Sequence, residues 1–310
     1  MKVKVIFLSF IIAVAGLVSI AAFAQQDEDV RGAFMTTRPK VTGKVTGESS
    51  GTTRPSRRRP KPAPTPKETV KKKTDRTPSP NPPTKLNTAR LGLGLTLFMR
   101  DSNGHAIRTD PSHEFRKGDH IRVLIETNAD GYLYVFNTTD GGQPVMIYPD
   151  PELDEAGNYF QAHVPFDLPS SLAAEERLRW LTFDEHPGDE RVYFVFTREP
   201  LNAVPIEDDL LTYCRNGKCP WSPGADVWAQ IQAEMNAAVK VAKVGGLGTT
   251  QTSTEEQAVV RGIGLNRNDP EPSLIMLTAS TNKNILVATL DLIHKSASLS
   301  GQVTTTGPAN

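Results

Sequence analysis

A chain of 310 residues could hold two domains, but its formal charge of zero at pH 7 hides an uneven composition. From Arg31 to Arg90 there are 16 Lys and Arg against three acids, a net charge of +13, whereas from Leu91 to Asn310 the net charge is −12. The basic part is rich in proline and poor in apolar residues, which excludes a buried core there, because too little surface can be buried to offset the entropy of ordering. We therefore expect residues 25–90 to form a disordered, locally extended linker.

The first 24 residues have the pattern of a signal peptide. Lys2 and Lys4 precede an apolar run, and the segment ends in Ala22-Phe23-Ala24, with the small residues of a cleavage site. We expect cleavage after Ala24 and an exported chain, periplasmic or extracellular. The alternative is an uncleaved membrane anchor, because the apolar run is close to the minimum length of a membrane span.

Two interpretations of the basic linker remain open. Its cations could hold an anionic surface or polymer of the cell envelope by counterion release. It could equally be a solvated spacer that keeps the folded part away from the surface. A nucleic-acid partner is not expected, because no aromatic residues alternate with the cations to stack on bases.

The strand patterns of the folded part begin at Leu91 and recur at short intervals. The residues expected to form strands are 91–99, 121–126, 132–136, 145–148, 160–164 and 191–197. Within 121–126, apolar residues alternate with Arg122 and Glu126, which predicts one buried face and one mostly wet face. Residues 132–136 are apolar on both faces, so this strand is expected to be central and covered on both sides. Gly131 before it is expected to serve the turn through a positive φ.

Short strands separated by turns are typical of an antiparallel β-sandwich or barrel. The segments that carry a family resemblance are, in order, Phe115-Arg116-Lys117-Gly118-Asp119, Asn128 to Asn137, Ile147-Tyr148-Pro149, Pro187-Gly188-Asp189-Glu190 and Arg198-Glu199-Pro200-Leu201. Together they resemble a bacterial family, domain of unknown function 4384, over residues 91–204. The resemblance implies an exported or surface-associated β module and supplies no catalytic residue. Its motif residues are expected to be structural: Gly118, Asp119, Gly131, Tyr132, Tyr134, Tyr148, Pro149, Pro187, Gly188 and Pro200.

The region after residue 204 has one clear helical pattern, at residues 223–244, whose apolar face is expected to pack on the sandwich. Residues 273–295 are expected to form a closing hairpin, so that 91–296 is one mainly β domain with one helix, followed by a disordered tail at 297–310. The only cysteines, Cys214 and Cys219, flank an Asn-Gly turn and are expected to form a structural disulfide.

No arrangement of residues for catalysis or metal binding is found in the sequence. The six histidines do not form a metal-binding pair at helical spacing, and the acidic loop at residues 150–158 lacks the glycine of a helix-loop-helix calcium site. There is no Gly-x-Ser-x-Gly motif, and both cysteines are assigned to the disulfide. The aromatic residues of the strands are expected to pack in the core, with a sugar-stacking surface as the alternative.

These observations predict an exported, non-enzymatic interaction module of the cell envelope, without cofactor or metal. We expect its partner to be an envelope protein, which requires an exposed apolar patch or sheet edge. A carbohydrate-binding module is the alternative, and a hydrolase is a third, less favoured hypothesis, because no cleft with converging acids is indicated.

Overall fold

The computed structural model describes residues 27–40, 90–151, 157–235, 237 and 239–296. The signal-peptide segment, the linker from residue 41 to 89 and the tail at 297–310 lie outside the described residues. Among the helices that are described, none has both the length and the apolar character that a membrane span requires.

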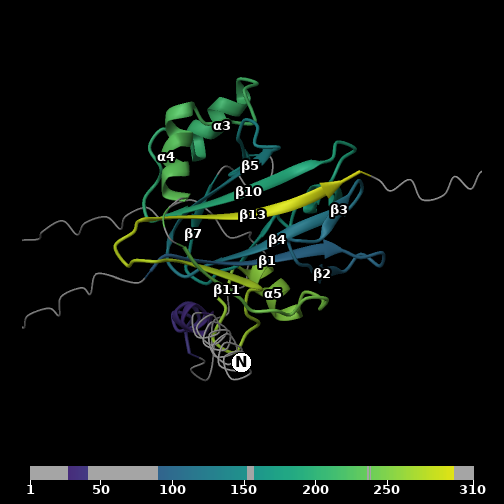
Figure 1. Cartoon of the computed structure of the whole chain (residues 1–310), viewed down its shortest axis with the longest axis vertical. Coiled ribbons are helices and arrows are strands. Elements are labelled where there is room, and N and C mark those ends of the chain that lie inside the picture. The colour runs from purple at the N-terminus through teal and green to yellow at the C-terminus, as the bar shows by residue number, and fades with distance from the viewer. Residues whose placement is uncertain (1–26, 41–89, 152–156, 236, 238, 297–310) are drawn as a thin grey trace, which may run out of the picture.

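Two β-sheets form the body of the molecule (Figure 1). The first sheet has the strand order β11-β12-β1-β4-β8, with β2 paired to β1 and β9 paired to β4. Its strands are β1 (Gly92–Arg100), β2 (Ala106–Arg108), β4 (His120–Thr127), β8 (Phe166–Leu168), β9 (Leu181–Thr182), β11 (Val239–Lys243) and β12 (Leu274–Thr278).

The second sheet has the order β3-β13-β10-β5-β6, with β7 paired to β5. Its strands are β3 (Glu114–Arg116), β5 (Gly131–Thr139), β6 (Val145–Tyr148), β7 (Tyr159–Phe160), β10 (Gly188–Thr197) and β13 (Ile285–Lys295). Most neighbours in both sheets are antiparallel, and β3 joins β13 in parallel. The mainly β class with two packed sheets is therefore confirmed.

The main core lies between the two sheets, where alternating side chains from each sheet meet. It includes Leu93, Leu95 and Leu97 from β1, Ile121, Val123 and Ile125 from β4, Leu133 and Val135 from β5, Phe194 and Phe196 from β10, and Leu286 and Leu290 from β13. Burial of this apolar surface is the main force that holds the sheets together.

The outer face of the second sheet is covered by α3 (Glu207–Arg215) and α4 (Ala225–Met235) (Figure 1). Tyr134 and Phe136 of β5 form a second buried cluster with Leu210 of α3 and Ile231 of α4. The prediction that residues 132–136 are covered on both faces is therefore confirmed, as is the packing of a helix on the sandwich.

The outer face of the first sheet is also covered, by α5 (Ser253–Arg261) and by a helix at residues 27–35 (Figure 1). The predicted wet face of β4 is wrong, because Arg122 is only 7% exposed and Glu126 only 2%. These charges are buried under elements that come from distant parts of the sequence, so local alternation could not distinguish a covered polar face from a solvated one.

The linker boundary also needs correction, because residues 27–40 fold onto the sandwich. Val30 and Phe34 are fully buried against Ala242, Ile275 and Leu277, on the outer face of β11 and β12. The dense Lys, Arg and Pro composition begins only after this segment, and an average over residues 25–90 concealed its apolar face.

The predicted helix at 223–244 is correct only in its first half. Residues 239–243 form β11, which pairs antiparallel with β12. Val239 and Val241 alternate with Lys240 and Ala242, a period-two pattern with β-branched residues that favours a strand where an edge is available for pairing. The structure also has α3 and α5, where one helix was expected, and a short 3₁₀ helix, η1 (Glu176–Arg179).

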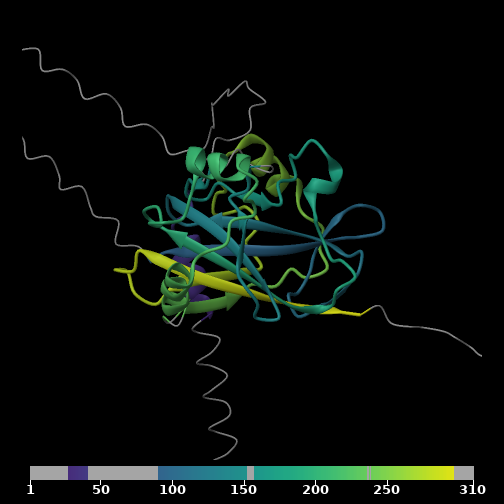
Figure 2. The same ribbon diagram turned by 90° about the horizontal axis from the view of Figure 1, so that it is seen from above.

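The closing hairpin at 273–295 is likewise wrong in its pairing, although both strands exist. β12 pairs with β1 and β11 in the first sheet, whereas β13 pairs with β10 in the second sheet. The chain therefore crosses between sheets after Thr278. From above, β13 runs along one side of the body (Figure 2).

Gly131 is needed because neighbouring atoms approach it closely and not because it has a positive φ, so the prediction that it serves the turn through a positive φ is wrong. A Cβ atom there would lie 2.3 Å from the carbonyl oxygen of Thr197 and 2.7 Å from the ring of Phe196. Gly118, in contrast, has a φ of +89°, in the turn where Asp119 accepts a hydrogen bond from the backbone N–H of Arg116.

Candidate functional site

An apolar cleft of about 500 Å³ opens between the sheets, beside β11, β12 and β13. The first sheet contributes Leu95, Leu97, Val241, Leu274 and Met276 to its lining, and the second contributes Leu290 and Ile293. Leu95, Leu97, Met276 and Leu290 also belong to the main core. The cleft is therefore an open side of the core, where no strand of the described residues closes the gap between the two sheets.

One edge of the cleft is the backbone of β13. This strand pairs with β10 over almost its whole length, from Ile285 to His294. On its other edge, among the described residues, only Ile293–Lys295 pair with a strand, the short β3. The preceding residues from Ile285 to Leu292 present an edge with no strand partner in the described part of the chain. Unpaired backbone groups on such an edge are a template for an additional strand.

The rim of the cleft combines exposed apolar groups with charges. Val241 is 38% exposed and Leu247 is 51% exposed, two of the four large apolar side chains that stand out on the described surface. Asp110, Lys243 and Asp291 also line the opening. Hydrogen bonds from Ser112 lower the pKa of Asp110, and Lys243 adds to this effect, so this carboxylate is ionised near neutral pH. Such a rim suits a ligand that is apolar in its centre and polar at its ends.

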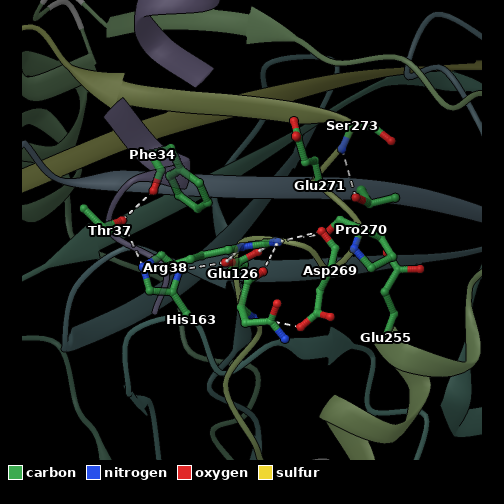
Figure 3. A network of polar contacts seen from close by, with 12 residues as sticks. Phe34, Thr37, Arg38, Glu126, His163, Glu255, Asp269, Pro270, Glu271 and Ser273 are labelled. Carbon is green, nitrogen blue, oxygen red and sulfur yellow. Dashed lines mark hydrogen bonds and ion pairs between the residues drawn. The ribbon is translucent and has the colours of Figure 1, made fainter. Parts of the chain in front are cut away.

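A buried polar network holds the N-terminal segment that backs this site (Figure 3). The Nε of Arg38 donates to Glu126 at 2.8 Å and its Nη2 donates to the other carboxylate oxygen at 2.6 Å. The same guanidinium donates to the carbonyl oxygens of Asn266, Asp269 and Pro270 at 2.9 to 3.1 Å. It therefore ties residues 27–40 to β4 and to the loop before β12, the strand that forms part of the cleft wall.

The same carboxylate faces His163, which gives the network the outline of a catalytic triad. The ring Nδ1 of His163 lies 2.7 Å from Glu126, and its Nε2 lies 2.9 Å from the hydroxyl of Thr37. However, Arg38 already neutralises the carboxylate through two bonds, and the Thr37 hydroxyl lies 2.5 Å from the carbonyl oxygen of Phe34, to which it donates. Because the Thr37 hydroxyl donates its proton to the Phe34 carbonyl oxygen and not to His163, it is not arranged as a nucleophile, and the geometry favours a structural role.

Two more arginine–carboxylate pairs lie on the same covered face of the first sheet. Arg108 pairs with Glu255, which also caps α5 through Thr252. Arg122 lies 3.6 Å from Asp167 and stacks over the ring of Trp180. Burial raises the pKa of Asp167, and the charge of Arg122 opposes that shift. These pairs fix elements from distant parts of the sequence onto one sheet.

The ten motif residues singled out from the sequence do not line the cleft. Tyr132, Tyr134 and Tyr148 are buried, and the hydroxyl of Tyr134 accepts a hydrogen bond from the backbone N–H of Leu201. Asp119 and Gly118 form a turn, Gly188 begins β10, and Pro149, Pro187 and Pro200 flank strands. The aromatic residues of β5 and β10 are in the core, so they form no flat stacking surface. Cys214 and Cys219 are disulfide-bonded at the end of α3, with Cα atoms 4.8 Å apart.

Comparison with known sequences matches one part of the chain to a family. Residues 114–200 match the model of the family described as Domain of unknown function (DUF4384). This stretch runs from β3 to the end of β10 and supplies strands to both sheets. No curated protein and no solved structure matches the chain.

The DUF4384 segment ends before most of the cleft lining begins. Every residue that lines the cleft, including Leu95, Val241, Met276 and Leu290, lies outside residues 114–200. Sequence reasoning missed the site because it placed Val241 and Lys243 in a helix and paired β12 with β13. The alternation at 239–243 was the available signal for β11.

Proposed function

We propose that the chain is an exported, non-enzymatic interaction module that binds an extended segment of a partner protein in the apolar cleft. The observation that carries this proposal is the unpaired edge of β13 beside an opening into the core. A partner strand could add its backbone to residues 285–292 and place alternate side chains against Leu95, Met276 and Leu290.

The open edge and the apolar lining each narrow the class of partner. A backbone edge binds an extended peptide through main-chain hydrogen bonds, while pockets for alternate side chains provide selectivity. The apolar lining favours aliphatic residues at every second position, and Asp110 and Lys243 at the rim favour a polar residue where the segment leaves the cleft. The carbohydrate alternative has less support, because the strand aromatics are buried.

Export is part of the same proposal. It is supported by the signal-peptide pattern that ends at Ala24 and by the Cys214–Cys219 disulfide, since disulfides persist in oxidising compartments. The mass of the chain recovered from the producing cell is expected to correspond to a start at Gln25. Retention of the first 24 residues would argue for an anchor.

The binding proposal is tested by selecting ligands for the full chain from a library of short random peptides. The expected result is enrichment of peptides with aliphatic residues at alternate positions. Leu247→Lys, at the rim, is expected to abolish this enrichment, because it places a flexible charge over the opening. Ile263→Lys is the matched control, because Ile263 is 49% exposed and lies outside the cleft lining.

The selected peptides allow a second comparison that isolates the backbone contribution. N-methylation at alternate positions removes the hydrogen-bond donors of one edge of the peptide and keeps its side chains. Addition to β13 predicts that one of the two methylation registers loses binding while the other keeps it. If both registers bind as well as the parent peptide, or if Leu247→Lys selects the same sequences, strand addition in the cleft is wrong.

A further inference from the structure

A second cavity, of about 230 Å³, opens between the sheets at another site, where β4 begins and β5 ends. Its apolar walls are Ile121, Ile147, Leu181, Phe183, Val192 and Leu292, and its polar lining residues are Asn137, Thr182, Asp184, Glu190 and His294. Except for Leu292 and His294, all of these residues lie within the DUF4384 segment. The cavity is thus a feature of the family segment, unlike the cleft.

Two carboxylates at this cavity are without a cationic partner from lysine or arginine in the described part of the chain. Glu190, which is partly buried, accepts hydrogen bonds from the Asn137 amide at 2.7 Å and from the Thr139 hydroxyl at 3.0 Å. Asp184, at the exposed mouth, accepts from the backbone N–H of His186 at 2.7 Å, and this bond lowers the pKa of Asp184. The Nδ1 of His186 also lies 3.2 Å from Asp184, so both carboxylates are oriented by neighbouring polar groups and not by a lysine or arginine of the described residues.

A buried imidazole adds a third polar group to the lining. His294 is only 5% exposed, and its ring packs against the ring of Phe183 with centroids 5.0 Å apart. No hydrogen bond to its ring nitrogens is found within the described residues. The side-chain oxygen Oδ1 of Asn137, also in the lining, is buried without a hydrogen-bond partner in the described part of the chain. Buried polar groups normally have a partner, so this acceptor beside a cavity points to a ligand that supplies a donor.

We propose that this cavity binds the side chain of a lysine or an arginine. The aliphatic stem of such a side chain would lie against the apolar walls, since these long side chains bury their methylene groups along apolar surfaces. Its cationic head would lie between Glu190 and Asp184, with an N–H available to His294. This proposal concerns a site separate from the cleft and does not depend on strand addition there.

The size and charge of the cavity both favour this ligand class. A free volume of about 230 Å³ is too small for most drug-sized ligands, which occupy about 300 to 1,000 Å³. An anionic ligand would face two carboxylates, and a purely apolar one would leave Glu190 and His294 without new partners. A chain of methylene groups with a cation at its end matches the apolar walls and the acidic mouth together.

The test is titration of the full chain with N-acetyl-lysine methylamide and with its norleucine analogue, which has a similar stem and no charge. Nuclear magnetic resonance at the His294 ring reports whether the probe enters this cavity. The expected result is that the lysine probe shifts the His294 signals and the norleucine probe binds at least about tenfold more weakly.

Glu190→Gln and Asp184→Asn are each expected to weaken the lysine probe by about tenfold, while keeping similar side-chain shapes. Glu199→Gln is the control, since Glu199 is exposed and lies outside the cavity lining. The proposal is overturned if the two probes bind equally, if neither perturbs His294, or if Glu199→Gln weakens binding as much as the cavity variants.

One further variant tests whether the basic side chain comes from this chain or from another molecule. The chain's own basic segment includes Arg54, Arg57, Arg58, Arg59 and Lys61, and replacing these five by glutamine removes the segment as a competitor of the probe. Tighter binding of the probe in this variant would show that the basic segment occupies the cavity. Unchanged binding would exclude the basic segment as the occupant and leave a basic side chain of another molecule as the source.

Discussion

Replacement of Arg38 by methionine tests whether the buried network holds the N-terminal segment in place. The Arg38 side chain is fully buried and that of Glu126 is 3% exposed, so the substitution leaves a carboxylate buried beside His163 alone. It also removes the donors to three carbonyl oxygens. Breaking a buried ion pair in this way costs about 3 to 5 kcal/mol of the free energy of unfolding.

Urea unfolding followed by circular dichroism measures this loss, and thermal unfolding is expected to show a Tm lower by about 6 to 20 °C. Arg177→Ala is the control: its side chain is 74% exposed in the pair with Glu175, and the expected loss is below about 1 kcal/mol. The double variant Arg38→Met with Glu126→Leu is expected to regain much of the lost stability, because it removes the unpaired charge. A loss in Arg38→Met no larger than that in Arg177→Ala would refute the structural role assigned to the network.

Two other changes probe the packing and the electrostatics of the sandwich. Gly131→Ala places a Cβ atom 2.3 Å from the Thr197 carbonyl oxygen and is expected to lower the free energy of unfolding by about 1 to 3 kcal/mol. The control is Gly32→Ala in the helix at 27–35, where a Cβ atom meets open space, and it is expected to raise the free energy of unfolding by up to about 1 kcal/mol. Chemical denaturation decides this, and a Gly131→Ala protein as stable as the parent would contradict the close approach. Burial raises the pKa of Asp167 in the folded state above its value in the unfolded state. Between these two pKa values the folded state binds more protons than the unfolded state, so the contribution of Asp167 to the free energy of unfolding decreases as pH rises. Asp167→Asn is expected to remove that part of the slope in denaturation curves recorded from about pH 4 to about pH 7, and an unchanged slope would show that the carboxyl titrates normally.

Much of the sandwich could be predicted from local patterns. Residues 132–136 are apolar on both faces, and this strand is indeed covered by the other sheet on one side and by α3 and α4 on the other. The strands at 145–148 and 191–197 were also clear, because turn residues bound them. Predicting these strands required only the period of the apolar residues and the position of the flanking turns, and both can be read from residues that are neighbours in the sequence.

The sites were harder to predict because long-range pairing creates them. The cleft exists because β12 joins the first sheet while β13 joins the second, and no local signal separates that arrangement from a hairpin. The buried charges of β4 depend on partners such as Arg38, which lies 88 residues away in the sequence. The cation site brings His294 next to Glu190 through the pairing of β10 with β13, which the sequence alone did not indicate.

The distant partners of the first and last strands also constrain when the chain can fold. Arg31 donates a hydrogen bond to Glu271, which lies 240 residues later in the sequence. β1 pairs with β12, and β10 pairs with β13, the last strand of the described chain. Contacts between residues far apart in the sequence form slowly, since the entropy of closing the long loop between them must be offset. Synthesis of the chain as far as residue 200 therefore leaves β1 without β12 and β10 without β13, each with an unpaired edge. The chain can reach its final structure only after almost all of it has emerged from the ribosome. Until then it stays incompletely folded and is expected to be a substrate for chaperones.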